Sequence, residues 1–350
     1  MLQMTDLSFR HRRYSPEMEA SVLRVVRSGR YIGGEVVAQA ETSAAKLFQR
    51  ELAVGVNSGT DGLILALQAL GVSKGDEVII PAVSFFATAG AVLAIGARPI
   101  TVDITPSGCM NPDLVSQAVN ASTRAIIPVH LYGTRCPLPQ TSIPIIDDAA
   151  QAAGATRPRS QGTITVLSTY PTKTWGGLGD GGFVLGDDPA LMDDVRCLAN
   201  HGWRRSTSQY DTVRGHAGRN SRLDAIQAAA LLEDLNSLTA RIEIRRATAT
   251  FYDEFLPKSL ARVPRDDESP VHQYAIRVRN RKQFRARLLE LGVQSAVYYA
   301  DPLHTHPMVE QRHPTPIADA FCKEITCLPI HAGISEEDRS QIVRAVERSL

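Results

Sequence analysis

Residues 167–182 read Leu-Ser-Thr-Tyr-Pro-Thr-Lys-Thr-Trp-Gly-Gly-Leu-Gly-Asp-Gly-Gly, and this stretch decides between two kinds of α/β fold. Its lysine, Lys173, follows an expected strand end and precedes a glycine-dense loop. Burial disfavours an ammonium ion, so a lysine held there has a lowered pKa and a more nucleophilic amine. The other five lysines lie in polar turns or on expected helix surfaces: Lys46, Lys74, Lys258, Lys282 and Lys323. Lys173 is therefore the candidate to form a Schiff base with a carbonyl group.

The glycines of the same stretch also match the G-x-G-x-x-G pattern of dinucleotide-binding folds, from Gly177 to Gly182. That pattern needs a strand before it and a helix directly after it. Here residues 183–185 read as a strand, and a helix starts only after Asp188-Pro189. The order argues against a Rossmann fold and favours a tight loop whose glycines supply positive φ and present Lys173.

Length and composition describe an ordinary globular protein. The 350 residues suffice for about two domains, and 43% of them are hydrophobic and 21% charged. The net charge of +1 gives no general attraction to nucleic acid or to an anionic membrane. We find no apolar window of membrane-spanning length and no signal-peptide pattern. The five cysteines are scattered and form no CxxC pair. We expect a cytoplasmic protein without a metal site.

Strands and helices alternate in the first half of the chain. Strands are expected at 52–56, 77–80, 99–102, 124–129 and 142–146, and helices at 36–49, 60–70, 85–95 and 111–119. Ser15-Pro16, followed by acidic residues, predicts the start of an earlier helix. Continuous apolar strands separated by helices predict an α/β fold with a mostly parallel sheet covered on both faces.

Beyond Gly182 the pattern becomes mainly helical. A long helical run is expected from Ser221 to about Leu256, with a break near Thr239. A strand at 272–278 and helices at 281–291 and 335–350 follow. These elements predict a large domain of residues 1–242 and a smaller α+β domain of residues 243–350.

Two loops at expected strand ends carry further signals. Asn57-Ser58-Gly59-Thr60 joins a strand to a helix, and its free N–H groups and hydroxyls form an anion cup. A plain helix cap is the alternative, but it does not explain the preceding Ser-Gly. Asp147 and Asp148 end a buried strand, where α/β proteins bind ligands. A cap accounts for one acid; the second, with Gln151, indicates a partner for a protonated ring nitrogen.

Together these motifs resemble the aspartate-aminotransferase-like sugar aminotransferases of the DegT/DnrJ/StrS type, which use pyridoxal phosphate to aminate nucleotide-linked keto-sugars. The resemblance runs in order through nearly the whole chain. It also includes residues 81–89, 96–99, 102–103, 130–133, 200–202, 218–224 and 302–304.

The resemblance implies a type I fold and a role for each matching residue. Lys173 corresponds to the Schiff-base lysine, Asp148 to the acid that keeps the pyridine nitrogen protonated, and Gln151 to the residue beside the ring hydroxyl. The remaining matches correspond to contacts with the cofactor ring, the phosphate and the substrate: Phe85 stacked on the ring; Ser58, Gly59, Thr60 and Ser168 around the phosphate; Asn220 reaching the phosphate of the partner subunit; and His201 and His304 near the substrate.

The implied reaction moves an amino group from an amino acid, L-glutamate in most of the family, to a keto-sugar. The implied assembly is a homodimer that shares its active sites. Three features depart from the family. Only 14 residues separate Gly133 from Asp148, Ser221 replaces a usual aromatic residue, and Trp175 replaces a usual leucine. The last two are candidates to alter the substrate pocket.

Alternatives remain within the same fold. A keto-cyclitol aminotransferase is one, and a regulatory protein that binds a ligand without turnover is another. A dehydratase branch of the family carries histidine at the Schiff-base position, so Lys173 argues against it. For His304 the alternative is a surface histidine in a polar loop.

Overall fold

The computed structural model describes residues 1–137, 140–155, 162–204 and 206–350, without the side chains of residues 10–15. Its larger part is built on two four-stranded sheets with the orders β12-β3-β2-β4 and β5-β6-β7-β1. The strands are β1 (Leu52–Val56), β2 (Glu77–Pro81), β3 (Arg98–Val102), β4 (Thr123–Ile126), β5 (Ile146–Asp148), β6 (Ile164–Ser168), β7 (Gly182–Gly186) and β12 (Glu310–Gln311).

The two sheets continue into each other through parallel bridges from Ile126 to Ile145 and from Val129 to Asp148. Only β7 runs against its neighbours β6 and β1, and the other pairs are parallel. The predicted mostly parallel sheet is confirmed. In such a sheet the carboxyl ends of the parallel strands share one edge.

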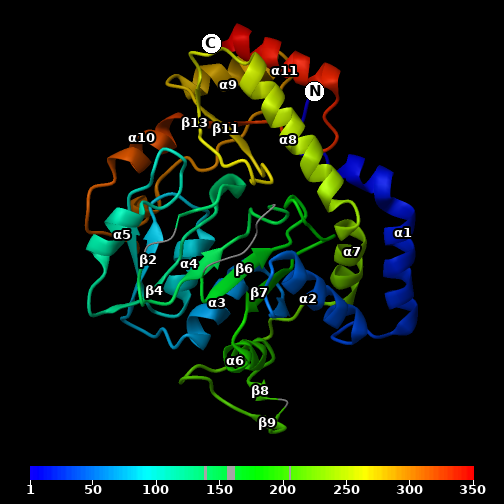
Figure 1. Ribbon diagram of the computed structural model, residues 1–350, viewed down its shortest axis with the longest axis vertical. Coiled ribbons are helices and arrows are strands. Elements are labelled where there is room, and N and C mark those ends of the chain that lie inside the picture. Colours follow the sequence, from blue (N-terminus) through cyan, green and yellow to red (C-terminus); the bar gives the residue numbers. More distant parts are fainter. Residues whose placement is uncertain (138–139, 156–161, 205) are drawn as a thin grey trace.

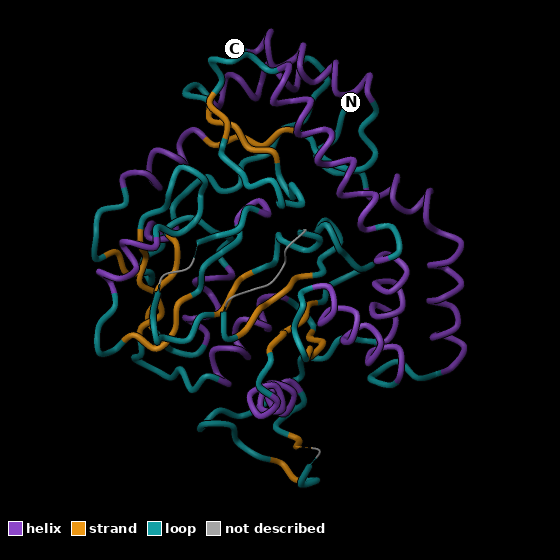
Figure 2. The backbone as a smooth tube through the Cα atoms, viewed as in Figure 1, coloured by secondary structure: helices purple, strands orange, loops and turns teal. Residues whose placement is uncertain are grey.

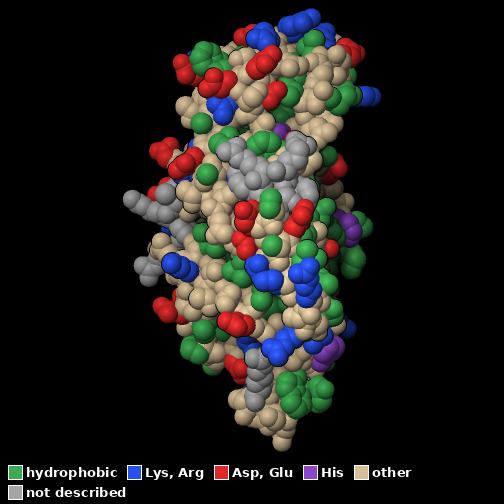
Figure 3. Space-filling model, turned by 90° about the vertical axis from the view of Figure 1, so that its right-hand side faces the viewer, with side chains coloured by type: hydrophobic (Ala, Val, Ile, Leu, Met, Phe, Trp, Pro, Cys, Tyr) green, Lys and Arg blue, Asp and Glu red, His purple; other side chains and the backbone are tan. Residues whose placement is uncertain are grey.

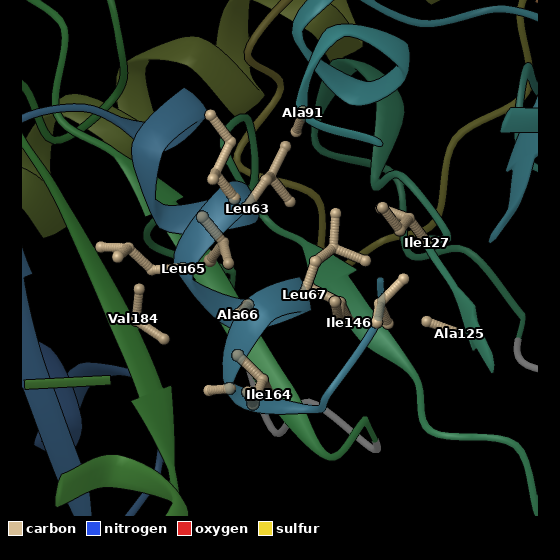
Figure 4. Close-up of a cluster of buried hydrophobic side chains, with 14 of the residues drawn as sticks. Leu63, Leu65, Ala66, Leu67, Ala91, Ala125, Ile127, Ile146, Ile164 and Val184 are labelled. Carbon is tan, nitrogen blue, oxygen red and sulfur yellow. The ribbon is translucent and has the colours of Figure 1, made fainter. Parts of the chain in front are cut away.

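Helix α3 (Gly59–Ala69) is the central element of the core. Residues 62–69 are all buried, because the helix is apolar on every side and packs against β5, β6 and β7. Figure 4 shows Leu63, Leu65 and Leu67 of α3 among sheet side chains such as Ile146 and Val184. Each such side chain contributes about 1.5–3 kcal/mol when fully buried. The start of α3 is therefore fixed at the edge where the strands end.

A second core lies against α2 (Glu35–Leu47) and α7 (Ala225–Leu235). Trp175 is fully buried there, stacks on Phe183 at 5.3 Å between ring centroids, and donates from Nε1 to the Leu231 carbonyl at 2.9 Å. The substitution for leucine at this position therefore fills the core beneath the glycine loop rather than lining a pocket.

The smaller part of the protein is a three-stranded antiparallel sheet covered by helices (Figures 1 and 2). Its elements are β10 (Ala261–Arg262), β11 (Tyr274–Arg277), β13 (Ile325–Leu328), α9 (Arg281–Glu290), α10 (Pro316–Glu324) and α11 (Glu336–Ser349). Figure 2 shows loops running between this sheet and the strands of the large sheet.

Helix α8 (Leu238–Phe255) links the two parts. Leu238 and Ile242 pack in the core around Trp175, whereas Ala249 and Tyr252 pack in the small part. The predicted boundary at residue 242 falls inside this helix, and the division remains a prediction. Two short segments pair with residues on the other side of this boundary. Leu2 pairs with Val293, and β12 pairs with β3.

Several predicted elements differ from the structure at their ends. Helix α1 (Leu7–Ser28) begins well before Ser15, because Asp6 caps it by accepting the Phe9 N–H at 3.0 Å, and Pro16 lies inside the helix. Strand β5 starts at Ile146 rather than at residue 142. Pro144, which has no N–H to donate, lies within the expected strand.

The break in the long helical run comes at residues 236–237, close to the predicted position. The remaining helices α4 (Ala87–Ala94), α5 (Pro112–Ala118) and α6 (Pro189–Ala199) confirm their predictions with small differences at the ends. On the face drawn in Figure 3, acidic and basic side chains are interspersed. In the described part of the chain, no helix is both long enough and apolar enough to cross a bilayer.

Candidate active site

The candidate residues gather where the parallel strands end. Strand β1 leads into Ser58, β2 leads toward Phe85, β5 ends at Asp148 and β6 ends at Ser168. The loop after β6 then carries Lys173. The topology thus brings residues from four separate motifs to one edge of the sheet.

Asp148 provides a buried carboxylate with spare capacity to accept hydrogen bonds. Its Oδ2 accepts from Thr88 Oγ1 at 3.1 Å and its Oδ1 accepts from the Ala150 N–H at 3.2 Å. Burial raises the pKa of Asp148, and the Ala150 N–H and the charge of Lys173 oppose that rise. A carboxylate accepts about four hydrogen bonds, and in the described residues this one receives two. The site therefore fits a further cationic N–H donor, as a protonated pyridine nitrogen would be.

Lys173 is the second half of this arrangement. Burial lowers the pKa of Lys173, and the charge of Asp148 opposes the lowering. The backbone N–H of Lys173 donates to the Tyr170 carbonyl at 2.8 Å, whereas its amine has no hydrogen-bond partner among the described residues. An amine with a lowered pKa and no competing partner is suited to nucleophilic attack on a carbonyl.

The neighbouring acid, Asp147, lies in different surroundings, because successive side chains of a strand point to opposite faces. Its Oδ2 accepts the Gly162 N–H at 2.8 Å, and its Oδ1 lies 3.8 Å from His130 Nε2. A Cβ on Gly162 would come within 2.6 Å of the same carboxylate. These contacts support a structural role for Asp147.

The amide of Gln151 is oriented by the backbone. The Tyr132 N–H donates to Gln151 Oε1 at 2.6 Å, so the Nε2 group is the end available as a donor. That Nε2 lies 3.4 Å from the hydroxyl of Tyr299. The turn around Tyr132 requires glycine at residue 133, because its φ is positive and an added Cβ would lie 2.9 Å from Pro270. Gln151 thus offers an N–H donor of the kind that a ring hydroxyl requires.

Tyr299 is a site residue that the sequence reasoning missed. Burial raises its pKa, as does the charge of Asp148, so the hydroxyl remains protonated. Its ring centroid lies 6.0 Å from that of Phe85, which is 59% exposed and does not pack in the core. The available signal was its place just before the matched residues 302–304. Phe85 and Tyr299 lie together at the mouth of the site.

The first turn of α3 forms the expected cup. Ser58 caps the helix by accepting the Asp61 N–H on its Oγ at 3.1 Å. A Cβ on Gly59 would lie 2.9 Å from the Cβ of Ser168, so only glycine permits this approach. Thr60 is exposed in the same turn. First-turn N–H groups have no intrahelical partner and bind phosphate readily. The residues present therefore fit pyridoxal phosphate at both its ring and its phosphate.

Among the described residues, Asn220 makes no hydrogen bond to its own cup. Its side chain is exposed and its Oδ1 accepts from Arg222 Nε at 3.2 Å. The buried Ser221 instead contacts the strand end before the cup, donating from Oγ to Asn57 Oδ1 at 3.2 Å. Ser221, which replaces a usual aromatic residue, thus supports the cup rather than lining an open pocket.

The two candidate substrate histidines differ in their surroundings. His201 is exposed and has a positive φ of 59°. His304 lies with Nε2 3.2 Å from Asp319 Oδ1 and Nδ1 3.3 Å from Thr315 Oγ1. Both ring nitrogens of His304 thus have partners within the chain. Their substrate roles remain predictions. In the described part of the chain, no group of three or more acidic, histidine or cysteine side chains is arranged to hold a metal ion.

The chain matches the sequence model of the DegT/DnrJ/EryC1/StrS aminotransferase family over residues 13–347. The protein belongs to this family. Its relatives include a UDP-2-acetamido-2-deoxy-3-oxo-D-glucuronate aminotransferase from Pseudomonas aeruginosa, 35% identical, with 95% of each chain covered. A dTDP-3-amino-3,4,6-trideoxy-alpha-D-glucose transaminase from Streptomyces venezuelae is also 35% identical, covering 97% of this chain and 94% of the relative. A pleiotropic regulatory protein from Geobacillus stearothermophilus matches equally well, at 35% identity over 98% of this chain and 97% of the relative.

Solved structures agree on the fold. DesV from S. venezuelae, in complex with a ketimine intermediate, superposes with a TM-score of 0.91 at 32% identity and covers 99% of this chain and 98% of its own. NtdA from Bacillus subtilis, with bound cofactor PMP, gives a TM-score of 0.89 at 26% identity, covering 99% of this chain and 85% of its own. The family and the site residues together identify a type I pyridoxal-phosphate-dependent aminotransferase.

Proposed function

We propose that this protein transfers an amino group from L-glutamate to a nucleotide-linked 3-keto-sugar. The sugar class is supported by the Pseudomonas and Streptomyces relatives, whose names specify nucleotide-linked sugars reacting at carbon 3. Nearly full coverage of both chains supports carrying the class over to this protein. Glutamate as the donor is supported by the resemblance to the family.

The observation that carries the aminotransfer is the buried pair of Asp148 and Lys173, each altering the other's pKa. Bound pyridoxal phosphate supplies an electron sink, which depends on its ring nitrogen keeping a proton. Asp148 holds that proton in place through its charge. The Nε2 group of Gln151 would donate a hydrogen bond to the ring hydroxyl. Lys173 takes a proton from the donor's α-carbon as a general base and later returns a proton to the keto carbon of the acceptor.

A substrate panel tests the proposal. Purified protein is incubated with glutamate or glutamine and with 3-keto and 4-keto nucleotide sugars, a 3-keto-sugar phosphate and keto-cyclitols. We expect amination of a 3-keto nucleotide sugar with glutamate. Preference for a keto-cyclitol would replace the acceptor assignment. A protein that binds the cofactor but aminates none of the panel would favour the regulatory role suggested by the Geobacillus relative.

We further propose a homodimer in which Asn220 of each chain reaches the phosphate site of the other. The exposure of Asn220, and the contact of its side chain with Arg222 instead of with the cup of its own chain, support an intersubunit role. Large apolar side chains are exposed on elements near the site, as expected of an interface: Tyr31, Ile32, Phe85, Phe86, Tyr170 and Leu178. Light scattering during gel filtration measures the assembly, and a monomer would contradict it.

We propose a cytoplasmic location as well. The five cysteines are all free thiols, which is usual where glutathione keeps thiols reduced. Fractionation of the source cells, with detection by antibody, tests this location. Recovery in an extracytoplasmic fraction would contradict it.

A further inference from the structure

An ion pair between Arg219 and Asp61 lies in the first turn of α3 and has no role in the chemistry described so far. Nη1 of Arg219 donates to Oδ1 of Asp61 at 3.2 Å, and the two side chains are 33% and 18% exposed, so solvent screens the pair only in part. In the described part of the chain, this is the one ion pair that Asp61 makes. The two residues are 158 positions apart, so only the folded chain brings them together.

The backbone holds Arg219 in place independently of the ion pair. Its N–H donates to the Leu198 carbonyl at 2.7 Å, and its carbonyl accepts the His201 N–H at 2.9 Å. The chain leaves α6 toward β8 (Trp203–Arg204) and β9 (Gln209–Tyr210), which lie at the far end of the molecule in Figure 1, and it returns at Arg219. The guanidinium group therefore reaches α3 from a fixed point beside the end of α6.

Asp61 lies beside the two N–H groups that form the cup. Its own N–H donates to Ser58 Oγ at 3.1 Å, whereas the N–H groups of Gly59 and Thr60 have no hydrogen-bond partner among the described residues. An anion in the cup would therefore bind at Gly59 and Thr60, with the carboxylate of Asp61 in the same helical turn. A phosphate monoester carries a charge of about −1.5 to −2 at pH 7. An uncompensated carboxylate so close to it would repel it.

We propose that Arg219 is a positioning residue of the phosphate cup, which neutralises Asp61 and so allows the first turn of α3 to hold the phosphate of the cofactor. This inference rests on the function proposed above and on the place given there to that phosphate. Arg219 acts through Asp61 and does not contact the phosphate itself. An acidic side chain in the first turn also stabilises a helix through its dipole. The ion pair thus keeps that stabilisation while removing the repulsion of the phosphate.

The binding of two ligands to cofactor-free protein tests this role. Pyridoxal phosphate and pyridoxal share the ring and the aldehyde, but only the first places a charge in the cup. Arg219→Gln leaves the carboxylate of Asp61 unpaired, so the affinity for pyridoxal phosphate should fall about tenfold while the affinity for pyridoxal stays the same. Fluorescence titration measures both affinities. An equal loss for the two ligands would show a merely structural role for Arg219 and would overturn the proposal.

Changing the other partner distinguishes neutralisation of Asp61 from a direct contact with the phosphate. In the double variant Asp61→Asn/Arg219→Gln neither charge is present, so the affinity for pyridoxal phosphate should return to that of the wild type. If Arg219 touched the phosphate itself, the loss would persist in the double variant, and the proposal would be wrong. Asp61→Asn alone should bind pyridoxal phosphate at least as tightly as the wild type, because the remaining guanidinium attracts the anion. Weaker binding by this variant would also contradict the proposal.

Arg277→Gln is the matched control. Arg277 pairs with Glu324 at 2.8 Å in the smaller part of the protein, and the two side chains are 28% and 27% exposed, so its loss should change neither affinity. Melting temperature identifies any variant that fails to fold, and Asp61→Asn alone decides if Arg219→Gln is such a variant. The assay contains no amino donor and no sugar. Wild-type protein that binds no pyridoxal phosphate would contradict the proposed function, whereas equal binding by the wild type and Arg219→Gln would overturn this inference alone.

Discussion

The carboxylate of Asp148 and the amine of Lys173 each oppose the other's loss of charge. Burial alone raises the pKa of Asp148 and lowers that of Lys173, and the charge of each partner acts against the shift of the other. This balance leaves a lysine with a lowered pKa beside an acid with a raised pKa, and a second cation near Asp148 would favour its ionised form. The first two predictions follow from this pair.

Replacing Lys173 should abolish turnover while leaving cofactor binding in place. Lys173→Ala removes the general base, which is worth about 10²–10⁴-fold, and also the covalent attachment. The wild-type protein should be yellow and change its absorbance when glutamate is added; the variant should bind added pyridoxal phosphate without glutamate-dependent turnover. Lys323→Ala, an exposed lysine of α10, is the control and should be normal. Appreciable turnover by Lys173→Ala would assign the role to another residue.

Asp148 and its neighbour Asp147 should respond differently to the same change. Asp148→Asn cannot hold the ring nitrogen protonated, and we expect a loss of about 10²-fold or more in kcat/KM. Asp147→Asn should be milder in activity, since its contacts are with Gly162 and His130 rather than with Lys173. Steady-state kinetics and melting temperatures on both variants make the comparison. Equal losses of activity would mean that the two acids are assigned wrongly.

The sequence revealed the site where its signals are local. Ser58 caps α3, and the strand that precedes it has the predicted bounds of 52–56, because a cap and a buried apolar run are both encoded within a few residues. Tyr299 was missed as a site residue. It comes from the smaller part of the chain, and no periodic pattern in a single sequence shows which distant side chains meet at a sheet edge.

The difference between local signals and contacts of distant residues also explains why strand β12 was missed. Strand β12 has two residues, and it exists because Glu310 and Gln311 pair with the edge strand β3, which only the folded chain brings near. The start of α1 was wrong for a different reason: two local signals competed. Ser15-Pro16 has the usual form of a helix start, but Asp6 caps the helix first, and a helix can include a proline at the loss of one hydrogen bond.

His304 separates two interpretations of the loop before α10. Its nitrogens lie near Asp319 and Thr315, which supports a structural role, whereas the resemblance implies a place near the substrate. If it handles substrate, His304→Ala should raise the KM of the sugar several-fold while the cofactor spectrum stays unchanged. Asp319→Asn is the matched control, since it changes the same contact with His304 from the other side. Equal effects of the two changes on melting temperature, with unchanged kinetics, would favour the structural role.

Asn220 tests the shared active site. Within its own chain, the side chain of Asn220 contacts Arg222 and its backbone pairs with Asn200. These contacts do not involve the phosphate cup of the same chain. If Asn220 serves the partner, Asn220→Ala should weaken cofactor binding about tenfold, the loss of one hydrogen bond to a charged group. Fluorescence titration with pyridoxal phosphate measures that affinity. Ser221→Ala, one residue on, contacts Asn57 of its own chain and provides the comparison.

Mixing two inactive parents then decides which subunit Asn220 serves. One parent carries Lys173→Ala, and the other carries Asn220→Ala and is assayed at limiting cofactor. In a mixed dimer with the contact made between subunits, one site combines an intact Lys173 from one chain with an intact Asn220 from the other, and the second site carries both lesions. Activity should therefore return on mixing, toward half that of a wild-type dimer for each mixed dimer formed. If both residues served the same chain, every site would keep one lesion and no activity would return. Tagged subunits confirm that exchange has taken place, so a mixture that exchanges fully and stays inactive would place Asn220 in its own subunit or remove it from the cofactor site.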